Sequence, residues 1–363
     1  VSQYNKDIDY WASSPSASEG LPEEFTHGDT HYWGVWWGKE PFSSYNTKIS
    51  SFMSEYGFQS FPEYSSFHKF AKGQDRDMYS EVMKSHQRSS IGNATIEEYL
   101  DQSYRKPIGF EELLYMSQLL QADGIQAAIE AHRRNKDRCM GSLYWQLNDC
   151  WPGASWSSID YYGKWKALHY KVKESFAPII VSYEFIEDNL QITVVSDLIT
   201  SYKGSLSITL SEFKGIEKIL SWNQEVNLAP NESKVVLTIP KDGLPKAENQ
   251  PYTYLQLTLS DENGIRASKN IYFKPFKEIV LPRPNLSFQV EFDKSNVLYL
   301  TVKSDHFARG VHVTCASNNN FSDNFFDMPI NGEKTISMQL DPLSDVDTII
   351  SSIKVRSLWD SIR

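Results

Sequence analysis

The stretch GFEELLYMSQLLQADGIQAAIEAHRR, residues 109–134, is followed closely by CMGSLYWQLND, residues 139–149, and the two predict how the first half of the chain folds. In the first stretch, apolar residues recur at steps of three and four, which is typical of an amphipathic helix. They are Phe110, Leu113, Leu114, Leu120, Ile125, Ala128 and Ile129. The second stretch has the pattern of a buried strand and ends in the polar pair Asn148 and Asp149. A helix followed at once by a strand favours a parallel β/α architecture.

Four apolar runs in the first half of the chain share one design, because each ends in aromatic and polar or charged residues. They are DIDYWASSP (7–15), GDTHYWGVWWG (28–38), KISSFMSEYG (48–57) and GSLYWQLND (141–149). In a β/α barrel the strand interiors fill the core, and the C-terminal strand ends carry the active site. The four runs therefore predict barrel strands whose ends form a site.

Glu55 is the single carboxylate in the run SFMSEYGFQSFP, residues 51–62. Phe52 and Met53 have the character of core residues, and an uncompensated buried charge costs several kcal/mol or shifts the pKa of the group. From the residues alone, Glu55 is either a strand-end glutamate paired with an arginine or lysine, or a carboxylate kept for chemistry.

Tryptophan is concentrated in the first half, where eight of the ten residues lie before residue 170. The indole N–H needs a partner, so tryptophan is a poor general filler of a core, whereas its faces stack well on apolar surfaces such as those of sugars. A sugar-binding site and a tryptophan-rich core are both compatible with this distribution.

The pattern changes near Pro178, after which alternating strands are separated by turn residues. This pattern of short strands separated by turns is typical of β-sandwich domains. Pro282 and Pro284, in the segment 276–286, indicate a stiff linker between two strand series. The predicted strands are LQITVVS, GSLSITL, SKVVLTIP, YTYLQLTLS and KNIYFKPF before the linker, and LSFQVEF, VLYLTVKS, VHVTCAS, KTISMQL and TIISSIKVRSLW after it.

Composition narrows the classes of ligand. The formal charge of −10 and the pI near 5.4 argue against nucleic acid as a partner. No apolar run is long enough to span a membrane. The three cysteines, Cys139, Cys150 and Cys315, lack metal-binding spacing, and no nucleotide or phosphate motif is present, so we expect no cofactor.

Several stretches in one order resemble the β-mannosidases of glycoside hydrolase family 2. They are GDTHYWGVWWGKEPF, FMSEYGFQSFPE, GSLYWQLNDCWPGASWSSIDYYGKWKALHY and, late in the chain, FSDNFFDMPINGEKTISM. The resemblance implies a multidomain α/β plus all-β protein: the C-terminal half of a TIM (β/α)8 barrel, followed by two immunoglobulin-like β-sandwich domains. The expected ranges are 1–178, 179–280 and 281–363.

The same resemblance implies a retaining exo-β-mannosidase that removes terminal non-reducing β-D-mannose, with Glu55 as its catalytic nucleophile. Trp145 matches the tryptophan that floors the terminal-sugar subsite. Strand neighbours alternate sides, so Tyr32, Trp33, Trp36 and Trp37 cannot all face the sugar. Of these we favour Trp37 and Tyr32 for contact with the substrate. His31 either bonds a hydroxyl or Glu55, or is a structural histidine with its hydrogen bonds satisfied.

One element of the family is absent from the sequence. The general acid/base is a glutamate in a Gly-Asn-Asn-Glu context, and no such motif occurs here. We therefore expect a fragment that is inactive alone and that either self-associates or pairs with the missing N-terminal half. The expected ligand is a β-mannoside oligosaccharide, with no nucleic acid and no membrane as partners. If the chain is family-like, its location is periplasmic, secreted or lysosomal.

Two alternatives remain open from the sequence. One is another family 2 hydrolase, resembling a β-glucosaminidase or a glucuronidase. The other is a non-catalytic carbohydrate-binding fragment, which the absent acid and the two sandwiches favour.

Overall fold

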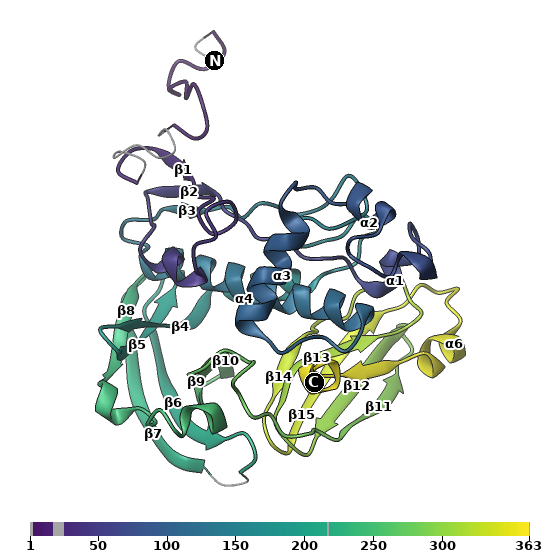
Figure 1. The fold of residues 1–363 in the computed structure, drawn as a ribbon. Helices are drawn as coiled ribbons and strands as arrows, with labels where there is room; N and C mark the ends of the chain where they lie inside the picture. Colours follow the sequence, from purple (N-terminus) through teal and green to yellow (C-terminus); the bar gives the residue numbers. More distant parts are fainter. Residues whose placement is uncertain (1–2, 17–24, 216–217, 363) are drawn as a thin grey trace.

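A computed structural model of the chain describes residues 3–16, 25–215 and 218–362. Figure 1 shows a helical part above two β-rich parts, with the N-terminal segment projecting away from the body. The helical part holds a short parallel sheet, β1 (Asp29–His31), β2 (Phe52–Glu55) and β3 (Gly141–Ser142). Its helices are α1 (Tyr64–Phe67), α2 (Glu81–Ser85), α3 (Gly92–Ser103), α4 (Phe110–Arg134) and α5 (Ala167–Ser175).

The parallel sheet has the order β1-β2-β3, so β2 lies in the middle. Met53 is opposite Thr30 on one side and Ser142 on the other. The predicted strand at 7–15 is wrong, because the structure assigns no strand there. Ile8 and Trp11 are 59% and 64% exposed, and an extended segment needs a neighbouring strand for its backbone hydrogen bonds.

Helix α4 confirms the helix predicted over 109–134 and connects the parts of the molecule. Near its start, the Tyr115 hydroxyl donates to the carbonyl of Gly310 in the C-terminal domain, at 2.5 Å. Near its end, Glu130 pairs with Lys269 of the middle domain at 2.7 Å. The second half of the helix is therefore buried on nearly all sides. Its buried polar side chains need hydrogen-bond or ion-pair partners, as Glu130 has in Lys269.

The middle part consists of two antiparallel sheets, with the orders β4-β5-β8 and β10-β9-β6-β7. Alternate residues from both sheets fill one core, which includes Leu190, Ile192, Leu206 and Leu257. Strands β4 and β7 were not among the predicted strands. The strands are β4 (Ile179–Ile186), β5 (Asn189–Ser196), β6 (Tyr202–Glu212), β7 (Lys218–Leu228), β8 (Ser233–Ile239), β9 (Thr253–Asp261) and β10 (Gly264–Tyr272).

The C-terminal part is a second pair of sheets, with the orders β11-β12-β15 and β14-β13-β16. The stretch 348–359, predicted as a strand, is mostly not one: helix α6 and the short strand β16 divide it. The elements are β11 (Leu286–Phe292), β12 (Val297–Ser304), β13 (Ala308–Thr314), β14 (Phe326–Met328), β15 (Gly332–Gln339), α6 (Val346–Ser351) and β16 (Lys354–Arg356).

The proline-containing segment between the two β-rich parts packs against its surroundings. Ile279 is buried, and the backbone N–H of Lys277 donates to the carbonyl of Ser103 at 3.0 Å. The Arg105 side chain donates to the carbonyls of Lys277 and Ile279. The segment is thus held in place by α3 and the residues after it.

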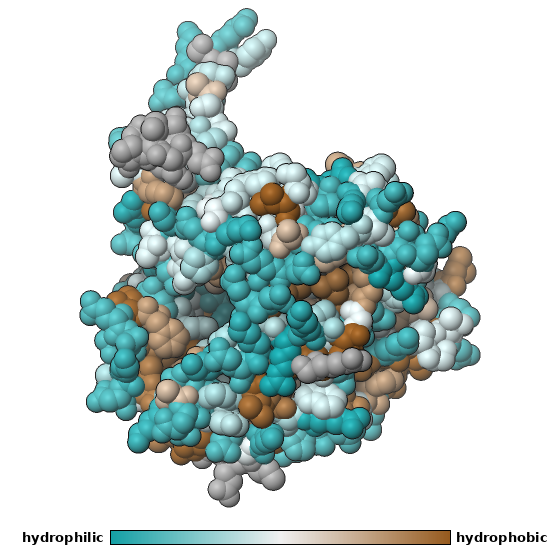
Figure 2. Space-filling view, viewed as in Figure 1, coloured by the Kyte–Doolittle hydropathy of each residue, from teal (hydrophilic) through white to brown (hydrophobic). Residues whose placement is uncertain are grey.

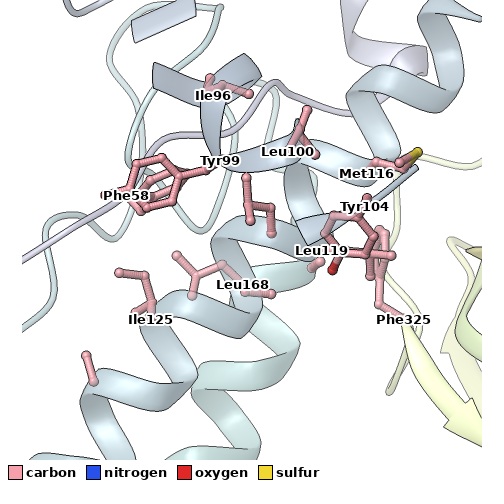
Figure 3. Packing of buried hydrophobic residues seen from close by; sticks show 14 of the residues in the cluster. Phe58, Ile96, Tyr99, Leu100, Tyr104, Met116, Leu119, Ile125, Leu168 and Phe325 are labelled. Carbon is pink, nitrogen blue, oxygen red and sulfur yellow. The ribbon is translucent and has the colours of Figure 1, made fainter. Parts of the chain in front are cut away.

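The largest core lies between α3, α4 and α5, and Figure 3 shows part of it. Phe325 enters this cluster from the C-terminal domain and lies near Tyr104 and Leu119 of the helical part. On the face seen in Figure 2, hydrophobic residues lie in separate patches among hydrophilic ones. Within the described ranges, no helix is both long enough and apolar enough to cross a membrane.

Candidate active site

Glu55 is the last residue of the central parallel strand β2. Its carbonyl accepts the backbone N–H of Tyr32 at 2.9 Å, which ties the end of β2 to the end of β1. A register shift in the β1–β2 pair places His31 opposite Glu55. The Glu55 side chain is 24% exposed, so the carboxylate lies at the C-terminal edge of the sheet and remains open to a ligand.

Two ring nitrogens approach the same oxygen of this carboxylate. His31 Nδ1 lies 3.3 Å from Oε2 of Glu55, and the indole Nε1 of Trp33 donates to Oε2 at 3.3 Å. No lysine or arginine in the described ranges forms an ion pair with Glu55. The alternative reading of Glu55, as the partner of an arginine or lysine, is therefore wrong, and the expected contact between His31 and Glu55 is present.

Trp145 follows β3 and lies next to the end of β2. Its backbone N–H donates to the carbonyl of Tyr56 at 2.8 Å. Trp145 is 41% exposed, so an aromatic surface is available near the end of β2. Gly57 allows this approach, because a Cβ atom there would lie 2.4 Å from the carbonyl oxygen of Trp145 and 3.1 Å from the rings of Trp33 and Trp156.

The two other predicted sugar contacts have different surroundings. Tyr32 is only 4% exposed, and its hydroxyl donates to Glu40 at 2.6 Å. Burial and this carboxylate raise the pKa of Tyr32 above its ordinary range. Its ring is part of the core, so in this chain it offers no surface to a ligand. Trp37 is 51% exposed and meets Trp36 edge to face, so its contact with a substrate stays a prediction.

Trp33 is the residue that the sequence reading did not select. Strand β1 ends at His31, and residues 34–37 form a turn, with Trp37 N–H donating to the Trp33 carbonyl at 2.8 Å. Strict alternation of sides therefore stops before Trp33. Gly34, directly after Trp33, and Gly38 could have indicated that turn, since glycine inside a strand pattern often marks a break.

A general acid requires a pKa near the working pH. Two further carboxyl groups, those of Asp29 and Glu63, do not have one. Burial works to raise the pKa of Asp29, but hydrogen bonds, above all from Ser14 and Ser54, lower it well below the ordinary range. Burial likewise works to raise the pKa of Glu63, yet the neighbouring His312 lowers it. Glu63 is also directed into the C-terminal domain, 3.3 Å from His312 Nε2. Neither group fits the acid role.

The loop after β3 is fixed by Asp149. Its Oδ2 accepts hydrogen bonds from the hydroxyls of Ser155 and Ser157, at 2.8 and 2.6 Å. Gln146 donates to its other oxygen at 3.2 Å. Asp149 thereby holds the chain directly after Trp145. Within the described part of the chain, no cluster of histidine, cysteine and acidic residues is arranged to hold a metal ion.

Comparisons with known families match the two β-rich parts. The family described as a mannosidase Ig/CBM-like domain matches residues 188–278, and the one described as an Ig-fold domain matches residues 281–361. These segments lie within the two ranges expected to be β-sandwiches.

Relatives extend the similarity into the helical part. The β-mannosidase of Capra hircus is 32% identical over 217 residues, which are 55% of this chain and 24% of that protein. The β-mannosidase B of Aspergillus clavatus is 26% identical over 319 residues, which are 82% of this chain and 37% of that protein. The chain thus spans well under half the length of these relatives.

A comparison with solved structures also finds a β-mannosidase. The β-D-mannosidase from Dictyoglomus thermophilum superposes with a TM-score of 0.84 and 27% identity, covering 93% of this chain and 41% of that one. The exo-chitosanase of Amycolatopsis orientalis, at 13% identity and a TM-score of 0.68 over 91% of this chain, shares the fold alone. Together these matches show that the chain is similar to the C-terminal portion of the β-mannosidases of glycoside hydrolase family 2.

Proposed function

We propose that this chain supplies the nucleophile and part of the terminal-sugar subsite of a retaining exo-β-mannosidase. The observation that carries the proposal is the position of Glu55: a partly exposed carboxylate at the C-terminal end of a parallel strand, bonded to His31 and Trp33, with Trp145 bonded through its backbone to the next residue, Tyr56. A retaining enzyme needs an ionised carboxylate beneath the anomeric carbon, where it forms a covalent glycosyl–enzyme intermediate.

In this mechanism an oxygen of Glu55 bonds to the anomeric carbon while the bond from that carbon to the leaving oxygen breaks. The leaving oxygen takes a proton from a general acid, and water later cleaves the glycosyl ester. The exposed indole of Trp145 stacks on the apolar face of the terminal sugar. Asp149 keeps that indole in place through the loop.

The general acid comes from outside these residues. Retaining enzymes hold the two carboxyl groups about 5–5.5 Å apart. Asp29, at the start of β1, has a pKa that hydrogen bonds hold well below the range of a general acid. We propose that β1, β2 and β3 belong to half of a (β/α)8 barrel, which a further polypeptide segment carrying the acid completes.

The open edges of the parallel sheet support the proposal that a further polypeptide segment packs beside it. In the order β1-β2-β3 both outer strands lack a second neighbour within the described ranges. Met140, Leu143 and Leu147, around β3, are 74%, 55% and 55% exposed. Unpaired edges and exposed apolar side chains favour association.

Covalent trapping tests the role of Glu55. An active enzyme that contains this chain is treated with a 2-deoxy-2-fluoro-mannosyl fluoride, and its peptides are examined by mass spectrometry. We expect the adduct on Glu55, with no adduct in Glu55→Gln and an unchanged adduct in the matched control Glu98→Gln, whose carboxylate pairs with Lys39 on the surface. An adduct on any other carboxylate contradicts the proposal.

Activity on other sugars tests the substrate. The distant exo-chitosanase fold leaves a β-glucosaminidase-like specificity as the second candidate. Comparison of kcat/KM on nitrophenyl β-mannoside, β-glucosaminide and β-glucuronide in the same enzyme separates them. We expect the mannoside to be preferred, and preference for either other sugar would replace the proposed substrate.

A further inference from the structure

A continuous line of hydrogen bonds leads from Asp29 to Glu55. The Ser14 hydroxyl lies 2.5 Å from Oδ2 of Asp29 and 3.2 Å from Nε2 of His31. The other ring nitrogen of His31, Nδ1, lies 3.3 Å from Oε2 of Glu55. The two carboxylates are thus joined through one hydroxyl and one imidazole.

The Asp29 end of this line fixes the direction of its hydrogens. Ser54 donates to Asp29 Oδ2 at 2.7 Å, and the backbone N–H of Ser16 donates to Oδ1 at 2.9 Å. Burial works to raise the pKa of Asp29, but the hydrogen bonds outweigh it and keep the group ionised. An ionised carboxylate only accepts, and a serine has one hydrogen to give. Ser14 therefore donates to Asp29, and its oxygen accepts a hydrogen from His31 Nε2.

The Glu55 end is fixed by Trp33. An indole nitrogen can only donate, and Trp33 Nε1 donates to the same Oε2 that faces His31. A carboxylate oxygen can accept hydrogen bonds from two donors. Oε2 of Glu55 then accepts one from Trp33 and a second from Nδ1 of His31. Both nitrogens of His31 carry hydrogen when both ends of the line are satisfied.

We infer that His31 is held as an imidazolium between Ser14 and Glu55, as a positioning residue and counter-charge for the Glu55 carboxylate. This inference rests on the proposed role of Glu55 for its functional meaning. The charged groups bonded into the line are Glu55 from β2 and Asp29 from β1, both acidic. No lysine or arginine within the described ranges is bonded to either one.

The consequence for chemistry is a carboxylate that is fixed in orientation. A hydrogen bond between an imidazolium and a carboxylate is charge-assisted and about twice as strong as a neutral one. Trp33 adds a second fixed donor to the same oxygen. Glu55 is therefore oriented to attack through its other oxygen.

The nitrogen-15 spectrum of the histidine rings tests the inference on this chain alone, at neutral pH and without substrate. The His31 signals are those missing from the spectrum of His31→Gln. We expect both of its ring nitrogens to show the shift of protonated nitrogen. His27, whose Nδ1 faces the Thr26 hydroxyl at 2.8 Å, serves as an internal control whose signals stay constant in all variants.

Two shape-conserving variants make the test decisive. In Glu55→Gln the carboxylate is replaced by an amide, so His31 should lose one proton and keep the one on Nε2. In Asp29→Asn the Ser14 hydroxyl is free to donate to Nε2, so His31 should become neutral with its hydrogen on Nδ1. Circular dichroism shows whether each variant is folded.

A neutral His31 in the unsubstituted chain, in either tautomer, overturns the inference. So does an unchanged His31 spectrum in folded Glu55→Gln. These outcomes are independent of the proposed function, whose own tests are the site of the covalent adduct and the preferred sugar.

Discussion

Trp33 donates its indole hydrogen to Glu55, although the two residues are separated by 22 positions in the sequence and Trp33 lies beyond the end of its strand. The ring is held in turn by an edge-to-face contact with Trp156, with ring centroids 6.0 Å apart. A donor that is fixed by packing orients the carboxylate better than a flexible lysine would, since it loses less rotamer freedom.

Trp33→Phe should retain most of the packing and remove only the donor. A hydrogen bond to a charged group contributes about 1.5–3 kcal/mol, so we expect at least about a tenfold slower formation of the covalent adduct on Glu55. The measurement is the inactivation rate with the fluorinated mannosyl donor. Trp222→Phe, in the middle domain, is the matched control and should leave the rate unchanged. Equal rates for the two variants would show that the indole bond has no role.

Gly57→Ala should disturb the site without touching Glu55 itself. The new Cβ would meet the backbone oxygen of Trp145 at 2.4 Å, and backbone cannot move aside as the end of a side chain can. Overpacking of this kind costs typically about 1–3 kcal/mol. We expect a lower urea midpoint and altered tryptophan fluorescence. Gly73→Ala is the control, because nothing lies within 4 Å of its Cβ position, and a loss as large there would contradict the steric explanation.

The buried His132 makes the free energy of unfolding depend on pH. It is buried on α4, its Nδ1 lies 2.8 Å from the Ser142 hydroxyl on β3, and burial, with a smaller contribution from Arg134, lowers its pKa to about 3. Because the folded pKa lies below the unfolded value, this contribution is full above about pH 6.5 and is lost as the pH falls toward 3. Between pH 7 and pH 5 the loss is about 2 kcal/mol.

Urea unfolding of the chain at these two pH values measures the effect. His132→Gln cannot titrate, so its stability should fall by less than that of the unsubstituted chain over the same interval. His169, whose pKa burial also lowers, contributes in the same direction in both proteins and cancels in the difference. A variant with the same pH dependence as the parent would exclude His132 as the source.

Much of the β-rich half could be predicted because period-two patterns in sandwiches are set by one buried face. Helix α4 was equally readable from its apolar steps. The end of the chain was not, since Asp345 caps a helix by accepting the N–H of Thr348, and the apolar run after it then resembles a strand. The cap at Asp345 therefore made the start of this segment a helix, although its apolar pattern predicted a strand.

The site was predicted less completely, for two physical reasons. The segment 7–15 has strand composition, but it pairs with no strand within the described ranges, although the outer edge of β1 is open. Tyr32 was favoured for contact with the substrate, yet its ring lies in the core and its hydroxyl donates to Glu40. Glu55 and Trp145 could be selected because motif and strand-end position agreed.

Arg309 connects three parts of the molecule, and its loss should loosen all of them. It is 4% exposed and pairs with Asp123 on α4 and Asp327 on β14, while Tyr272 of β10 donates to Asp327. Removing one partner of a buried ion pair costs about 3–5 kcal/mol. We expect Arg309→Met to lower the urea midpoint strongly.

A surface ion pair provides the comparison for this variant. Lys241 pairs with Asp188 at 2.6 Å, but both side chains are about two-thirds exposed or more, at 74% and 68%. Such pairs contribute about 0–1 kcal/mol. Lys241→Met should therefore be nearly neutral, and an equally mild Arg309→Met would mean that the Arg309 ion pairs contribute little to holding the three parts together.

The chain alone should be inactive on mannobiose and should not remain a monomer. Without the acid, a poor leaving group departs unassisted, and positioned acid catalysis is worth about 10²–10⁴-fold. Both outer strands of the β1-β2-β3 sheet lack a second neighbour in the part of the chain that the structure describes, and Met140 and Leu143 beside β3 are largely exposed. Light scattering should show self-association, which addition of a polypeptide carrying the rest of the barrel reverses. Met140→Lys together with Leu143→Lys should reduce self-association, whereas Leu343→Lys, at a 99% exposed position in the C-terminal domain, should not. A monodisperse monomer without a partner, or turnover of mannobiose by that monomer, would show that the described residues form a complete unit.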